Sequence, residues 1–250
     1  MPLINPVAID LGFLTVRWYG IMAAFTIVGG ILLGRFWANE FSISIEDFNM
    51  IALACIPSWI IGARAAYVLS NFEAYRQEPL EMLLINHGGL ASQGGLILTF
   101  AVSYAIAQHM KVKFWSLADA FGPVFAMGHI LIRIGNFANG ELYGAPTALP
   151  FGIIFPGTSQ PRHPSMLYEA AGAILVLILS MMWAKRRRFQ GEVFLNALVS
   201  ISILRFFVDL TRDHSSHLFG GIALSQISAL LYIAAALALR KWLSKAGQIE

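Results

Sequence analysis

Residues 116–144 read SLADAFGPVFAMGHILIRIGNFANGELYG and join an apolar run to a dense polar one. Its first part is apolar enough to span a bilayer, and its end gathers Arg133, Asn136, Asn139 and Glu141 in a short polar run. Ionisable groups at membrane depth are costly to bury, so they usually face a cavity and have a function. A cationic pocket in a lipid-facing protein indicates an anionic lipid headgroup or a transition state that carries charge.

The composition is that of an integral membrane protein. The 250 residues are 57% hydrophobic and 12% charged, with a mean hydropathy of +0.66, whereas a soluble domain carries about 25% charged residues. We expect one membrane domain over 1–250 and no removable signal peptide at 1–15. The single cysteine, Cys55, excludes an intrachain disulfide and a cysteine-based metal site. The small net charge of +3 lies mostly at helix ends, which is typical of membrane topology rather than of nucleic-acid binding.

The hydrophobic pattern predicts an all-α bundle of seven transmembrane helices, because a spanning helix needs about 20 mostly apolar residues. The predicted spans are 17–37, 48–70, 83–108, 116–135, 165–184, 192–211 and 220–240. Four glycines interrupt the third span at 87–95 and disfavour a continuous helix there. Such backbone must be buried in protein or line a wet cavity. Five prolines in 136–164 predict an ordered extramembrane cap with little helix between spans four and five.

The distribution of lysine and arginine predicts the orientation, because cytoplasmic loops carry an excess of both. One side of the predicted bundle has ten such residues and the other has four. The ten are Arg35, Lys111, Lys113, Lys185, Arg186, Arg187, Arg188, Arg240, Lys241 and Lys245, and the four are Arg17, Arg76, Arg162 and Arg212. We therefore expect an outer N-terminus, a cytoplasmic C-terminus and a cap on the outer side.

Arg133 is the first candidate for binding a ligand. Its guanidinium offers a fixed fork of donors that matches phosphate oxygens. Asn136 adds neutral donors, and Glu141 can orient an arginine or accept a hydrogen bond from a hydroxyl. Glycines such as Gly135 and Gly144 allow the backbone to approach a ligand closely. The alternative is an arginine that extends to the membrane surface and is followed by a turn.

A second candidate pair lies in the sixth predicted span. Arg205 and Asp209 are spaced i,i+4 and share one helix face. They either form a structural ion pair, or Asp209 holds Arg205 ready for an anion bound opposite. Tyr19, at the outer start of the first span, is either an interfacial anchor or part of the site.

The interrupted third span contributes His87 and Gln93. Gln93 donates and accepts hydrogen bonds but cannot act as a base near neutral pH. His87 can take a proton, although a structural role is the other interpretation of a lone histidine near a helix break.

Residues 162–169, RHPSMLYE, enter the fifth predicted span. Ser165 indicates a helix N-terminus, and helix N-termini attract anions. His163 and Glu169 are interpreted as residues that secure the cap to the bundle. The spacing of the histidines predicts no metal site.

Together these motifs resemble those of the prolipoprotein diacylglyceryl transferases of bacterial inner membranes. Residues 133–144 resemble the family signature, close to G-R-x-G-N-F-x-N-G-E-x-x-G, with Ile132 in place of its first glycine. The other similar segments are 17–20 (R-W-Y-G), 162–169 (R-H-P-S-Q-L-Y-E), 205–212 (R-F-x-x-E-x-x-R) and the surroundings of Gln226 (G-Q-x-x-S). The matches follow the family's order from residue 17 to about 228.

The resemblance implies an enzyme of lipoprotein maturation. The family transfers the diacylglyceryl group of phosphatidylglycerol to the lipobox cysteine of a preprolipoprotein and releases glycerol 1-phosphate. The implied partners are that lipid, that acceptor and the bilayer of the bacterial inner membrane, with a periplasmic N-terminus and neither cofactor nor nucleic acid. Carried over, Arg133 contacts the lipid phosphate and Arg205 lies on the other side of the reacting centre. The positions that match the family's needs for activity or pocket shape are Tyr19, Asn136, Glu141, Gly144 and Asp209.

Gln93 departs from the family, which has a histidine there that is assigned as the base for the acceptor thiol. Either the base is dispensable, because a thiol beside two arginines ionises more readily, or His87 replaces it, or the activity is altered. We favour the first, because cations at a leaving phosphate contribute several kcal/mol, whereas a general base gives about 10²–10⁴-fold. A lipid or anion transporter and a transferase with a different acceptor are the alternative functions.

Overall fold

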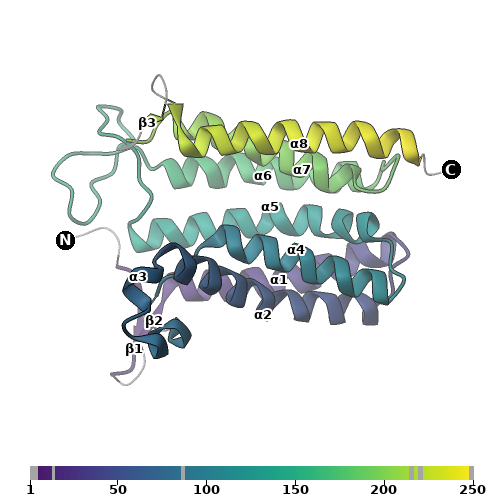
Figure 1. Cartoon of the computed structure of the whole chain (residues 1–250). Coiled ribbons are helices and arrows are strands. Elements are labelled where there is room, and N and C mark those ends of the chain that lie inside the picture. Colours follow the sequence, from purple (N-terminus) through teal and green to yellow (C-terminus); the bar gives the residue numbers. More distant parts are fainter. Residues whose placement is uncertain (1–4, 13–14, 86–87, 214–216, 219–221, 248–250) are drawn as a thin grey trace. The chain divides into compact units, whose positions relative to one another are not determined.

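The computed structural model describes residues 5–12, 15–85, 88–213, 217–218 and 222–247 (Figure 1). The chain forms two compact units. The larger comprises Met1–Trp37 and Ala118–Glu250, and the smaller comprises Ala38–Leu117. The chain passes from one unit to the other within the helices α1 (Trp18–Glu40) and α5 (Phe114–Asn139).

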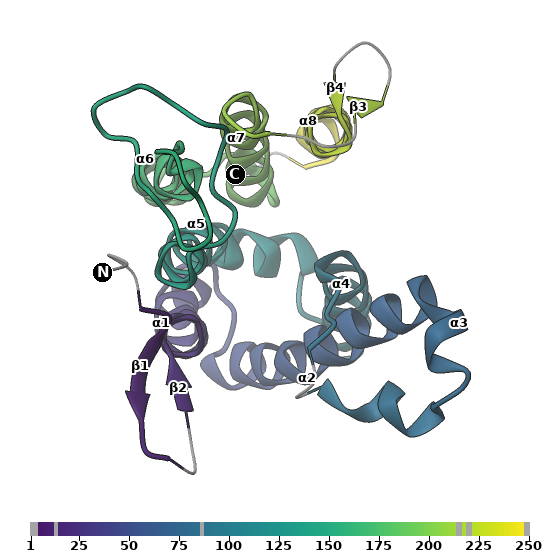
Figure 2. The ribbon, with the colours of Figure 1, turned by 90° about the vertical axis from the view of Figure 1, so that its left-hand side faces the viewer.

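The larger unit begins with a short hairpin and is otherwise built from long helices. Strands β1 (Val7–Asp10) and β2 (Thr15–Arg17) pair antiparallel and lead directly into α1 (Figure 2). The helices after α5 are α6 (Ser165–Ala184), α7 (Glu192–Asp209) and α8 (Leu224–Ala246). The two-residue strands β3 (His217–Leu218) and β4 (Ile222–Ala223) precede α8. Helix α7 packs against both α6 and α8 (Figures 1 and 2).

Small side chains hold the helices of the larger unit close together. The core between α5, α6 and α7 consists of Ala126, Ala173, Val176, Ala197 and Ile201, all buried. Small residues permit the close backbone approach that stabilises membrane helices, since no hydrophobic effect drives them together in lipid. The chain therefore uses alanine and glycine where a soluble bundle would use larger residues.

A buried carboxylate fixes the start of α7. Asp119 of α5 accepts hydrogen bonds from the backbone N–H groups of Gly191, Val193 and Phe194 at 2.7, 2.8 and 3.1 Å. Asp119 also forms an ion pair with Arg187, at 3.1 Å. The first N–H groups of a helix have no partner within the helix, and Asp119 supplies one from the neighbouring helix.

The smaller unit consists of α2 (Ile45–Ser70), α3 (Phe72–Tyr75), the 3₁₀ helix η1 (Pro79–Leu83) and α4 (Ser92–His109). Helices α2 and α4 pack along each other through glycines. A Cβ added at Gly62 would lie 2.4 Å from the carbonyl oxygen of Gly94, and one added at Gly95 would lie 2.8 Å from the Trp59 ring nitrogen. Gly94 and Gly95 therefore allow helix contact, and the prediction that they interrupt the third helix was wrong.

The predicted break itself is present, but it lies earlier in the chain. The helical part of the predicted 83–108 span begins only at Ser92. Gly88 and Gly89 adopt φ values of +85° and +80°, which glycine tolerates best. Of the helices in the described residues, α1, α2, α5, α6 and α8 are long and apolar enough to cross a membrane. The chain is thus a mostly helical membrane protein.

The helix-free connection predicted for 136–164 also begins later in the chain. Helix α5 continues to Asn139, so 136–139 is helical, and Gly140 with φ +69° follows the helix end. Residues 140–164 contain no helix, as expected for that part. Isolated β-bridges join Arg162 to Pro146 and to Ile153, so this connection is an ordered loop.

Candidate functional site

Glu169 of α6 lies at the centre of a buried ionic cluster in the larger unit. The side chain is 0% exposed. Its Oε2 lies 2.7 Å from Nε of Arg133 and 2.9 Å from Nε2 of His129. Its Oε1 accepts a hydrogen bond from Nη2 of Arg212 at 2.5 Å. The carboxylate therefore joins α5, α6 and the turn after α7.

Arg133 is also held by hydrogen bonds with the polar residues that follow it in the sequence. Its Nη1 donates to Oδ1 of Asn136 at 3.1 Å, and Nδ2 of Asn136 donates to Oε1 of Glu141 at 3.0 Å. Asn139 also donates to Glu141, at 3.3 Å. Because Arg133 is only 8% exposed and bound on two sides, it is not an arginine that extends to the membrane surface.

Arg205 does not pair with Asp209, so the structural ion pair considered from their spacing is absent. Asp209 instead lies 3.2 Å from Arg212, which follows the end of α7 and turns back toward it. Among the described residues Arg205 has no hydrogen-bond or ion-pair partner. Its charge interacts electrostatically with Arg133 and with His129. The two predicted arginines therefore lie in one electrostatic environment, with Arg212 as a third member.

Tyr19 lies beside the same run. A Cβ added at Gly135 would be 3.1 Å from Cδ2 of Tyr19 and 3.4 Å from its Cα, so α1 and α5 touch here. The half-buried phenol interacts electrostatically with Glu141 and Arg133. The space at Gly135 is occupied by Tyr19, and the expectation that this glycine leaves room for a ligand was wrong.

Gly144, like Gly135, lies where protein segments pack closely together. A Cβ there would lie 2.3 Å from the carbonyl oxygen of Thr211 and 2.4 Å from Oγ of Ser165. Its N–H donates to the carbonyl of His163 at 2.7 Å. Ser165 and Thr211 share a hydrogen bond at 2.7 Å, so this point joins the 140–164 connection to the start of α6 and the end of α7. Gly144 thus fits protein atoms rather than a ligand.

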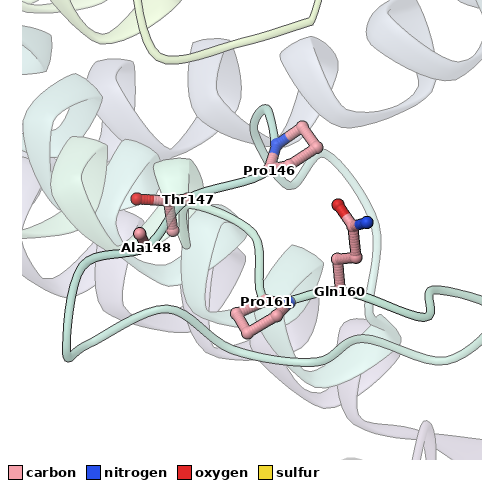
Figure 3. A pocket seen from close by; sticks show the side chains of 5 residues that line it. All are labelled: Pro146, Thr147, Ala148, Gln160 and Pro161. Atoms are coloured by element: carbon pink, nitrogen blue, oxygen red, sulfur yellow. The ribbon is translucent and has the colours of Figure 1, made fainter.

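The 140–164 connection has a pocket of its own, which is uncharged. It has a volume of about 390 Å³ (Figure 3). The residues that line it are Pro146, Thr147, Ala148, Gln160 and Pro161. The backbone N–H of Thr147 donates to the carbonyl of Pro161 at 2.9 Å, so the two sides of the pocket are joined. With no charged group in its lining, this pocket does not suit a phosphate.

The two residues expected to secure the cap differ in what they contact. His163 does so, because its N–H donates to the carbonyl of Ala145 at 3.0 Å and its Nδ1 lies 3.1 Å from the Tyr168 hydroxyl. Glu169 does not, because its partners are on α5 and after α7. The interpretation of Glu169 as a cap residue was therefore wrong.

Gln93 belongs to the smaller unit, where it is the exposed second residue of α4. His87, the other candidate base in this segment, lies outside the described residues. Before α4, the backbone at 81–84 and at 88–89 is held by Arg64 of α2, a buried arginine.

The guanidinium of Arg64 donates hydrogen bonds to backbone carbonyl oxygens. Nε donates to Met82 at 3.0 Å, Nη1 to Gly88 and Gly89 at 2.5 and 3.1 Å, and Nη2 to Glu81 and to Leu84, the latter at 3.1 Å. An arginine has five N–H donors, so this one is fully used within the protein. Arg64 therefore joins the backbone at 81–84 to the backbone at 88–89, close to the start of α4.

Sequence reasoning missed the ionic cluster around Glu169 that holds Arg133. Glu169, His129 and Arg212 come from three separate segments, and only their fold brings them together. One signal was available, because His129 and Arg133 are spaced i,i+4 and share a helix face. Among the described residues no group of three or more metal-binding side chains occurs.

Comparison with known proteins gives one consistent result. A model of the family described as prolipoprotein diacylglyceryl transferase matches residues 6–242. Curated relatives named phosphatidylglycerol–prolipoprotein diacylglyceryl transferase include one from Finegoldia magna, 33% identical over 94% of both chains. A second relative, from Geobacter sulfurreducens, is 36% identical over 87% of this chain and 85% of the relative. A third, from Nitratidesulfovibrio vulgaris, is 35% identical over 92% of this chain and 90% of the relative.

Proposed function

Because the chain belongs to the prolipoprotein diacylglyceryl transferase family, we propose that it transfers the diacylglyceryl group of phosphatidylglycerol to the cysteine thiol of a preprolipoprotein lipobox. The second product is glycerol 1-phosphate. The observation that carries this function is the buried guanidinium of Arg133, fixed by Glu169 and Asn136 and accompanied by two further arginine charges.

Arg133 is suited to bind the lipid phosphate because one nitrogen of its guanidinium is available to donate hydrogen bonds. Its Nε faces Glu169 and its Nη1 donates to Asn136. Among the described residues Nη2 has no hydrogen-bond partner, so its two N–H groups remain for phosphate oxygens. Because its other two nitrogens are held, little side-chain entropy is lost when the phosphate binds.

Arg205 and Arg212 raise the positive charge around this point. Together with Arg133 they outnumber the buried carboxylates Glu169 and Asp209. The acceptor thiolate attacks the glycerol carbon that carries the phosphoester, the C–O bond breaks, and the departing phosphate gains charge. Fixed donors at developing charge lower the barrier, typically by about 2.7–4 kcal/mol for each donor. We assign this role to Arg133 and Arg205.

The remaining predicted residues shape the site around these arginines. Asn136 and Glu141 orient Arg133, and Asp209 orients Arg212. Tyr19 lines the same region from α1, with its hydroxyl available to the lipid headgroup. Gly144 holds the loop after α5 in place. Gln93, in the smaller unit, is limited to hydrogen bonding, because an amide cannot take a proton near neutral pH.

The membrane arrangement extends the same proposal. Helices α4 and α7, of 18 residues each, would join the five more apolar helices as spans, giving seven in one domain over 1–250. An 18-residue helix is about 27 Å long, close to the thickness of the hydrocarbon core. From the excess of lysine and arginine we infer a cytoplasmic C-terminus, and a periplasmic N-terminus and 140–164 connection.

The test is incubation of the purified protein with phosphatidylglycerol and a lipobox peptide, followed by mass spectrometry of the peptide. We expect a mass increase of one diacylglyceryl group on the cysteine. A matched peptide with serine in place of cysteine should stay unmodified. Modification of both peptides would indicate a different acceptor, and lipid movement across vesicles without any modified peptide would indicate a transporter.

A further inference from the structure

His129 is a buried histidine for which the mechanism above has no use. It lies on α5 one turn before Arg133, and its side chain is 13% exposed. Its Nε2 lies 2.9 Å from Oε2 of Glu169. Among the described residues its Nδ1 has no hydrogen-bond partner.

The neighbours of His129 define its tautomer. Glu169 also pairs with Arg133 and Arg212, which favours its ionised form, so its oxygens only accept hydrogen bonds. Nε2 of His129 must therefore carry the hydrogen that Glu169 accepts. In the neutral ring this leaves Nδ1 as a lone-pair acceptor. A base oriented by a carboxylate on its other nitrogen is the arrangement that activates nucleophiles in many enzymes.

The charged groups that face His129 come from three helices. Glu169 of α6 lies beside the ring and is suited to stabilise an imidazolium, whereas Arg133 of α5 and Arg205 of α7 add positive charge nearby. When the ring gains a proton, the carboxylate at 2.9 Å is positioned to stabilise its charge. This balance suits a group that takes up and gives back a proton.

We propose that His129 is the general base that deprotonates the acceptor thiol, an inference that rests on the proposed transferase function. In this proposal the base is the imidazole that α5 supplies, and it is not dispensable.

The proposed step balances as follows. Nδ1 of His129 takes the proton from the cysteine S–H, and the sulfur electron pair forms the bond to the glycerol carbon. The C–O bond to the phosphate breaks, and its electron pair stays on the phosphate oxygen beside Arg133. The imidazolium then returns its proton to the released phosphate or to water, which regenerates the neutral ring.

The test compares transfer rates of the wild type and His129→Gln over roughly pH 5 to 8. Glutamine keeps an N–H donor for Glu169 and removes the base. We expect His129→Gln to be about 10²-fold slower at neutral pH, and its deficit to shrink as rising pH ionises the thiol without help. The exposed His109 on α4 provides the control, because His109→Gln should match the wild type.

A second arm examines the pH dependence of the loss. A loss that is equal at every pH would mean that His129 only positions Glu169, and would overturn the proposal. So would a rate within about threefold of the wild type.

A third arm needs no variant. A selenocysteine acceptor ionises below neutral pH and requires no base. In the wild type, the fall in transfer rate at acidic pH should be present with the cysteine peptide and absent with the selenocysteine peptide. Identical pH profiles would overturn the role of His129. A wild type that modifies neither peptide at any pH would instead refute the transferase function on which the role rests.

Discussion

Glu169→Gln should destabilise the protein strongly, because Glu169 is the fully buried counter-ion of two arginines. The change keeps the side-chain volume and removes the negative charge that faces Arg133 at 2.7 Å and Arg212 at 2.5 Å. Removing one partner of a buried ion pair typically costs about 3–5 kcal/mol, since the remaining charge loses its compensation. The amide still accepts one hydrogen bond, so we expect about 3 kcal/mol.

The assay is thermal unfolding in lipid nanodiscs, followed by tryptophan fluorescence. For a chain of this size about 1 kcal/mol corresponds to about 2–4 °C, so Tm should fall by roughly 6–12 °C. The control is Glu73→Gln, which removes a solvent-exposed pair with Arg76 at 3.1 Å. Exposed pairs contribute about 0–1 kcal/mol, so this Tm should stay within about 4 °C of the wild type.

A double-mutant cycle tests the reason as well as the size. The double variant Glu169→Gln, Arg212→Gln lacks the arginine charge that Glu169→Gln alone leaves uncompensated. Its loss of unfolding free energy should therefore be smaller than the sum of the two single losses by about 0.5–3 kcal/mol. If Glu169→Gln melts within the range of the Glu73→Gln control, Glu169 is not a stabilising counter-ion and the description of the cluster is wrong.

Three further outcomes follow from the same contacts. Gly144→Ala should lower the free energy of unfolding by about 1–3 kcal/mol, because its Cβ would lie 2.3 Å from the Thr211 carbonyl oxygen. The control Gly20→Ala should not lower it, because nothing lies within 4 Å of a Cβ there. Equal melting temperatures of the two variants would contradict the packing role of Gly144. Arg64→Lys should speed hydrogen exchange at 81–84 and at 88–89 at least tenfold, because an ammonium cannot serve five carbonyls. Unchanged exchange would show that these residues are ordered without the guanidinium. Gln93→His should keep or raise the transfer rate measured by peptide mass, and an inactive variant would indicate a site adapted to another reaction.

The sequence predicted the helices well because their apolar runs are long and separated by strong turn signals. The predicted span 165–184 coincides with α6, and 192–211 differs from α7 only at its end. The error at 87–95 has a physical cause. Glycine both breaks helices and lets them touch, and only the contact of Gly94 with Gly62 shows which use applies.

The site was predictable only where its residues are close in the chain. The contacts of Arg133 with Asn136, and of Asn136 with Glu141, lie within one run. The pairing of Glu169 with Arg133 and Arg212 spans more than 30 residues in each direction and depends on how α5, α6 and α7 pack. For the same reason the local spacing of Arg205 and Asp209 indicated a pair that the turn after α7 replaces with Arg212.

The most direct test of the account is the kcat of Arg133→Ala at saturating phosphatidylglycerol, measured from the mass of the lipobox peptide. Stabilisation of the departing phosphate acts on the transition state, so kcat should fall by about 10²–10³-fold in a protein that remains folded. A kcat equal to that of the wild type, with only a raised KM, would contradict it, because Arg133 would then bind the lipid without assisting the bond to break.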